Sequence, residues 1–121
     1  MTQATAQDVF DLEGLSRRMM GDRELMAEIV SEFVADLSSQ ITGLRASIAN
    51  GDERSIARQI HTIKGASANV GAKGLERLAR GAESAGLAKQ TERADAFVLS
   101  LVEHFELFKT AVQENGYLRE L

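Results

Sequence analysis

The chain has 121 residues, of which 44% are hydrophobic and 26% charged, and its 18 acidic and 14 basic residues give a net charge of −4. This length and composition predict a single globular domain, and the lack of cysteine excludes disulfides, thiolate metal sites and cysteine nucleophiles. There is no basic run, no long apolar stretch and no signal-peptide pattern, so we expect a cytoplasmic protein that binds neither nucleic acid nor membrane.

Helices are favoured from the start of the chain, because proline is absent and only 5% of the residues are aromatic. Residues 1–9 are expected to form a flexible polar tail. A short helix is predicted from Leu12 to Met19, with Asp11 as its N-cap. Gly21-Asp22 then ends this helix and caps the next one.

A long helix is predicted over residues 22–49, because an apolar stripe recurs every three or four residues. The stripe consists of Leu25, Ile29, Phe33, Leu37, Ile41, Leu44 and Ile48, and Met26, Val30 and Val34 widen it. The turn Asn50-Gly51-Asp52 stops this helix and caps the following one.

Three more helices are predicted, ending near Gly71, Gly86 and Glu114, the last one beginning at Thr91. Their inward residues are expected to be Ile56, Ile60, Ile63, Ser67 and Val70, then Leu75, Leu78, Ala79 and Ala82, then Ala94, Phe97, Leu101, Phe105, Phe108 and Val112. Short connections make neighbouring helices antiparallel, so we predict an all-α fold: an antiparallel up-and-down four-helix bundle over residues 10–116, with a short additional N-terminal helix. Residues 117–121 are expected to form a C-terminal tail.

The chain has two histidines, and they have different surroundings. His104 lies one position from the apolar line of the last helix, which is typical of a residue at the boundary of the core. His61 follows the inward Ile60 and therefore points about 100° away from the core.

Small residues and one lysine share the helical face of His61. Ala57 precedes it by four positions, and Lys64, Gly65 and Ala68 follow it by three, four and seven. A neutral imidazole, whose ordinary pKa is near 6.5, can attack a phosphoryl group without a separate base, and a lysine one turn away can offset the added charge of roughly −1.5 to −2. An ordinary exposed His–Lys pair remains an alternative from the residues alone.

The segment 57–72, ARQIHTIKGASANVGA, resembles the signature of histidine-containing phosphotransfer (HPt) domains. In that signature a phosphorylated histidine is followed by an apolar residue, lysine, glycine, small residues, an apolar residue and glycine. The opening from Phe10 to Leu15, Gly21-Asp22 and the turn at Asn50-Gly51-Asp52 are also similar to the family. The resemblance extends from about Phe10 to Val112.

The resemblance implies roles for individual residues. His61 is the expected phosphoacceptor, Lys64 lies near the phosphate, and Gly65 leaves room for a partner. Glu83, on the following helix, is the expected hydrogen-bond partner that orients the imidazole. From the residues alone, Glu83 could equally be a solvated side chain that pairs with Arg80.

The resemblance also implies the partners, which are receiver domains of a sensor histidine kinase and of a response regulator. We expect them to dock on the small residues around the histidine, Ala57, Gly65 and Ala68. The stripe of Leu12, Leu15 and Met19 either caps the bundle, which we favour, or contributes to docking. Because the chain has neither a P-loop nor a dense acidic cluster, we expect no intrinsic cofactor, and we expect Mg²⁺ on the partner receiver domain.

A small helical bundle is also compatible with other functions. A di-iron bundle is disfavoured because no glutamate precedes either histidine by three positions. A non-catalytic adaptor that binds a receiver or a partner helix without phosphotransfer remains the alternative. The initial Met and the short tails favour a stand-alone protein over a fragment of a larger kinase, and a monomer is expected because no apolar stripe is left over.

Overall fold

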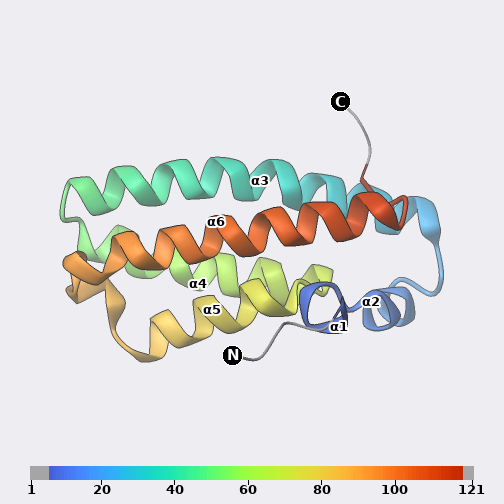
Figure 1. Cartoon of the computed structure of the whole chain (residues 1–121), viewed down its shortest axis with the longest axis horizontal. Helices are drawn as coiled ribbons and strands as arrows, with labels where there is room; N and C mark the ends of the chain where they lie inside the picture. The colour runs from blue at the N-terminus through green and yellow to red at the C-terminus, as the bar shows by residue number, and fades with distance from the viewer. Residues whose placement is uncertain (1–5, 119–121) are drawn as a thin grey trace.

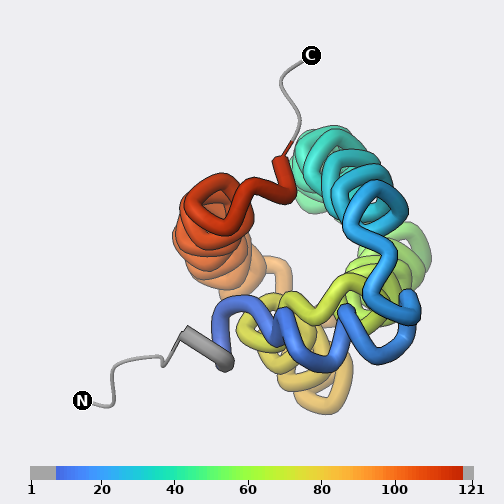
Figure 2. The backbone as a smooth tube through the Cα atoms, turned by 90° about the vertical axis from the view of Figure 1, so that its right-hand side faces the viewer, coloured from blue at the N-terminus to red at the C-terminus, as the bar shows by residue number. Residues whose placement is uncertain are grey.

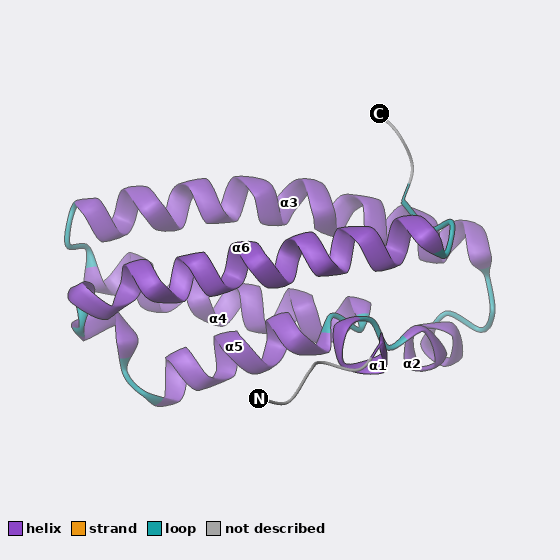
Figure 3. Ribbon diagram, in the orientation of Figure 1, coloured by secondary structure: helices purple, strands orange, loops and turns teal. Residues whose placement is uncertain are grey.

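The computed structural model describes residues 6–118, and within this range every regular element is a helix (Figure 3). The elements are α1 (Ala6–Val9), α2 (Leu12–Arg18), α3 (Arg23–Ala49), α4 (Glu53–Val70), α5 (Lys73–Ser84), the short 3₁₀ helix η1 (Leu87–Lys89) and α6 (Thr91–Glu114). The prediction of an all-α fold is confirmed. No helix in the described part of the chain has the length and apolar character needed to cross a membrane.

The helix boundaries follow the capping residues that the sequence predicts. The side chains of Asp11, Asp22 and Asp52 each accept a hydrogen bond of 3.1 Å from the backbone N–H three residues further on, which satisfies a donor at the start of α2, α3 and α4. Gly71 (φ 79°) and Gly86 (φ 65°) take left-handed conformations that end α4 and turn the chain after α5.

The four longest helices lie along the long axis of the molecule and surround a common interior when they are viewed end-on (Figures 1 and 2). α3 packs against α4 and α6, and α5 packs against the same two helices. The short α1 and α2 cover one end of this group, where the guanidinium of Arg18 donates a hydrogen bond of 3.2 Å to the backbone oxygen of Asn69 at the end of α4.

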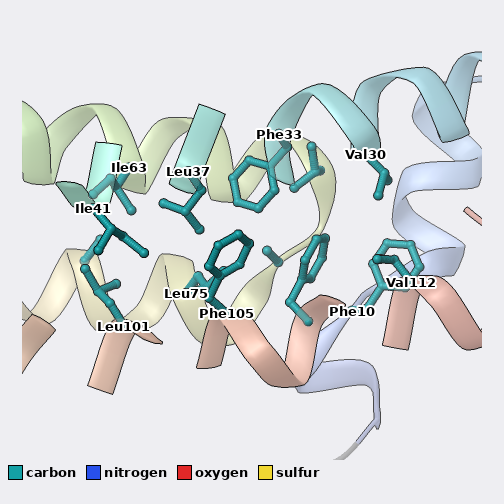
Figure 4. Close-up of a cluster of buried hydrophobic side chains, with 14 of the residues drawn as sticks. Phe10, Val30, Phe33, Leu37, Ile41, Ile63, Leu75, Leu101, Phe105 and Val112 are labelled. Atoms are coloured by element: carbon teal, nitrogen blue, oxygen red, sulfur yellow. The ribbon is translucent and has the colours of Figure 1, made fainter. Parts of the chain in front are cut away.

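The interior is one apolar cluster to which α3, α4, α5 and α6 all contribute (Figure 4). At one end of it, the ring of Phe108 packs edge-to-face on Phe33, with centroids 5.3 Å apart, and on Phe10, with centroids 5.5 Å apart. All six inward residues predicted for the last helix are buried. The segment before α2 is therefore held against this end of the apolar interior by an aromatic contact.

The predicted stripe of the long helix is wrong at its N-terminal end. Leu25 is 38% exposed and Ile29 is only half-buried, whereas Met26 and Val30 are buried. A step of four residues advances about 40° beyond a full turn, so the steps back from Phe33 through Ile29 to Leu25 move the stripe away from the core. The positions one residue later stay on the buried side.

The predicted tails also differ from the structure. Ala6–Val9 form α1 within the expected tail of residues 1–9, and Tyr117, assigned to the C-terminal tail, is buried with its ring centroid 6.3 Å from that of Phe10. These segments are too short for a helical period to reveal them. Residues 1–5 and 119–121 lie outside the described residues.

Candidate functional site

The site lies on α4 and α5, which pack directly against each other. Ile60 and Ile63 are buried and fix the orientation of α4. His61, between them in sequence, points outward with 68% of its side chain exposed. The packing of α4 therefore presents one imidazole to solvent, as the spacing of the apolar residues predicts.

The imidazole is held by a carboxylate from the neighbouring helix. Nδ1 of His61 lies 2.7 Å from Oε2 of Glu83, and Nε2 has no hydrogen-bond partner among residues 6–118. An ionised carboxylate can only accept, so Nδ1 carries the proton of the contact and Nε2 of the neutral ring keeps its lone pair. The geometry therefore leaves the outward nitrogen free to act as a nucleophile.

Lys64 binds the same carboxylate through its second oxygen. Its ammonium pairs with Oε1 of Glu83, so one side chain of α5 bridges two side chains of α4. The Lys64 ammonium, and after it the His61 ring, hold the pKa of the Glu83 carboxyl below its ordinary value of 4.5. Arg80 pairs with Glu76 instead, so the alternative pairing of Glu83 with Arg80 is absent from the structure.

The residues around the imidazole are small and leave it accessible. Ala57, Gly65 and Ala68 are all exposed. A Cβ atom added to Gly65 would meet no other atom within 4 Å, so packing within this chain gives no reason for a glycine there. The structure brings His61, Lys64 and Glu83 together and surrounds them with small residues.

A family model for the Hpt domain matches residues 28–114. The chain belongs to the Hpt family. The matched range includes all of α4, α5 and η1 and therefore the whole site. At the level of the family, Hpt domains carry out phosphotransfer in two-component signalling and interact with receiver domains. No curated protein and no solved structure matches the chain.

The second histidine of this Hpt domain has the boundary position that the sequence predicts. His104 is half-buried, and its Nδ1 lies 3.0 Å from the backbone oxygen of Ser100 one turn earlier. Its ring is in close contact with α5, since a Cβ atom on Gly74 would lie 2.9 Å from it. Within residues 6–118 no three His, Cys, Asp or Glu side chains gather as a candidate metal site.

Sequence reasoning missed one structural neighbour of the Hpt site, the 3₁₀ helix η1. It lies between Gly86 and Thr91, where the sequence predicts no helix, and places Leu87 in the core. The signal for it was an apolar pair, Leu87-Ala88, between a glycine and a lysine. Three residues are too few to show a period, so only the apolar character of the pair could have indicated burial.

Proposed function

We propose that this Hpt domain relays a phosphoryl group through His61, between the aspartate of a receiver domain of a sensor histidine kinase and the aspartate of a response regulator. The observation that carries the proposal is the exposed imidazole, whose Nδ1 is held by Glu83 while Nε2 has no partner among the described residues. A nucleophile with a fixed tautomer and an open approach is what such a transfer requires of the carrier.

In the proposed step, the lone pair of Nε2 attacks the phosphorus of an aspartyl phosphate. A P–N bond forms, the P–O bond to the aspartate breaks, and the receiver's carboxylate leaves with the electron pair. The ring keeps its proton on Nδ1 and gains positive charge, which the carboxylate of Glu83 stabilises. The second transfer is the reverse, with an aspartate oxygen as the nucleophile and Nε2 as the leaving group.

The charge on the transferred phosphoryl oxygens needs neutralisation from both proteins. In this chain Lys64 is the cation next to the imidazole network, and we propose that it compensates part of that charge. We expect Mg²⁺ on the partner receiver domain and no intrinsic cofactor here. The protein is accordingly a stoichiometric carrier, and the name enzyme depends on convention.

The proposed docking surface is the small-residue face formed by Ala57, Gly65 and Ala68. We propose that α3 to α6 form the antiparallel four-helix bundle expected of the family, which keeps this face rigid while a receiver approaches. The open space beside Gly65 supports the proposal, since it admits another protein's backbone close to the imidazole. We further propose a cytoplasmic monomer, with a domain over residues 10–116.

The test is phosphotransfer from purified receiver domains of the source organism, each labelled on its aspartate by radioactive acetyl phosphate. The wild-type chain should take the label from at least one of them. His61→Gln should take none, because the amide has no nucleophilic nitrogen. His104→Gln is the matched control and should be labelled at the wild-type rate.

Two results would contradict this function. If no receiver in the set transfers its label to the wild-type chain, the relay is wrong. If a receiver binds the wild-type chain and keeps its label, the non-catalytic adaptor is the correct function instead.

A further inference from the structure

An apolar hollow of about 190 Å³ opens between α4, the end of α5 and η1. The buried Ile60, Ala82 and Leu87 line it, together with the more exposed Ala57 and Ala88. Two larger hollows of the described chain, one lined by Arg45 and Asp95 among others and one by Phe10 and Asn115 among others, share no residue with the surroundings of His61. The hollow between α4, α5 and η1, in contrast, is lined by Glu83, the residue that binds the imidazole of His61.

The turn after α5 creates the hollow. Gly86 takes a left-handed conformation, and the chain then places Leu87 in the core and Ala88 at the side of the opening. An alanine at Ala57 on α4 and another at Ala82 on α5 leave the space unfilled.

The hollow and the phosphotransfer site share two residues. Ala57 lies one turn before His61, and Glu83 binds the imidazole, yet both also line the hollow. A protein that brings a phosphorylated aspartate to Nε2 of His61 must therefore cover the region that borders this opening. The two features form one continuous surface.

The size of the hollow decides what can occupy it. Pockets for small-molecule ligands span roughly 300–1,000 Å³, which exceeds this one, so a single apolar side chain fits better than a cofactor or metabolite. We infer that the hollow receives an apolar side chain of the receiver domain that docks at His61, an inference that rests on the proposed function.

The charge at the rim of the hollow indicates a second property of the receiver surface that docks there. Lys89 lines the opening, and within the described part of the chain its ammonium makes no ion pair. Glu83, which also lines the opening, is already bound by Lys64 and His61. The uncompensated charge is positive, so the receiver's inserted side chain has an acidic neighbour that faces Lys89.

Ala88→Phe tests the inference, because the added ring fills the hollow from a position that does not touch His61. With the receiver that labels the wild-type chain fastest, the KM for the receiver should rise about tenfold or more, as expected when an apolar anchor loses its burial. The rate at saturating receiver should stay within about twofold of wild type. Ala88→Leu should give a smaller increase.

Ala96→Phe is the matched control, because Ala96 is an exposed alanine on α6 that does not line the hollow, and it should leave KM unchanged. Labelling of His61 by phosphoramidate, a small donor that needs no docking, should be equal in all variants and shows that each one is folded. An unchanged KM for Ala88→Phe and Ala88→Leu, with wild-type transfer intact, overturns the inference alone. Failure of the wild-type chain to accept any label overturns the proposed function and the inference with it.

Discussion

At the scale of single residues, one carboxylate organises the site. Glu83 uses one oxygen for the Nδ1 proton of His61 and the other for the ammonium of Lys64. Both partners favour the ionised form, which is why the pKa of Glu83 lies below 4.5. A group with a lowered pKa keeps its contribution above the ordinary pKa and loses it as the pH falls through the lowered value, so the contact with the imidazole is intact at neutral pH.

Glu83→Ala should slow the proposed transfer about tenfold, because the imidazole then samples both tautomers and more orientations. Glu83→Gln should keep most of the rate, since its amide oxygen still accepts from Nδ1. Nitrogen-15 NMR of His61 measures the tautomer directly. A single Nδ1–H tautomer in Glu83→Ala, together with the wild-type rate, would show that Glu83 does not position the ring.

At the scale of secondary-structure elements, Asp11 ties α2 to the turn between α4 and α5. The carboxylate of Asp11 caps α2 by accepting a hydrogen bond from the backbone N–H of Gly14. The backbone N–H of Asp11 donates a hydrogen bond of 2.8 Å to the backbone oxygen of Gly71. Oδ2 of Asp11 lies 3.6 Å from the ammonium of Lys73. A Cβ atom on Gly71 would lie 2.8 Å from the backbone oxygen of Asp11. The glycine therefore serves both the left-handed turn and this close approach.

Asp11→Ala should lower the free energy of unfolding by about 1–2 kcal/mol at pH 7, as urea denaturation measures it, because it removes a cap and an ion pair. Asp52→Ala removes a cap whose side-chain hydrogen bonds both go to Ser55 in the first turn of its own helix, so its loss should be smaller. The N–H of Gly14, and then Lys73, hold the pKa of Asp11 below 3.8. The difference between wild type and Asp11→Ala should therefore shrink as the pH falls below that value. An equal loss of unfolding free energy for Asp11→Ala and Asp52→Ala would argue against a role of Asp11 in joining α2 to the turn between α4 and α5.

The elements also show which features a sequence can predict. Asp11, Asp22 and Asp52 identified the starts of three helices, because capping depends on one side chain and a backbone group three residues away. Leu25 was misplaced, because its burial depends on how the whole helix rotates against its neighbours. The contact of Glu83 with His61 joins residues 22 positions apart, and only the family resemblance pointed to it.

At the scale of the whole molecule, Phe108 links segments from both ends of the chain by packing on Phe10 and Phe33. Phe108→Ala should lower the free energy of unfolding by about 3–5 kcal/mol, a large part of the roughly 5–15 kcal/mol available to a domain of this kind. Leu99→Ala removes an apolar side chain that is 63% exposed and should change it by less than about 0.5 kcal/mol. Urea denaturation measures both free energies of unfolding. Similar losses for the two variants would show that the aromatic contacts of Phe108 are not a major source of stability.

The empty space beside Gly65 has a consequence for how this chain balances the stability of its fold against the binding of a partner. An alanine there would fit without contact and would strengthen the isolated helix by roughly 1 kcal/mol. If the proposed relay is correct, the unbound domain always lacks this stabilisation, and the glycine is useful only while a receiver domain is bound. A search that optimised the stability of the free protein alone would replace this glycine with alanine.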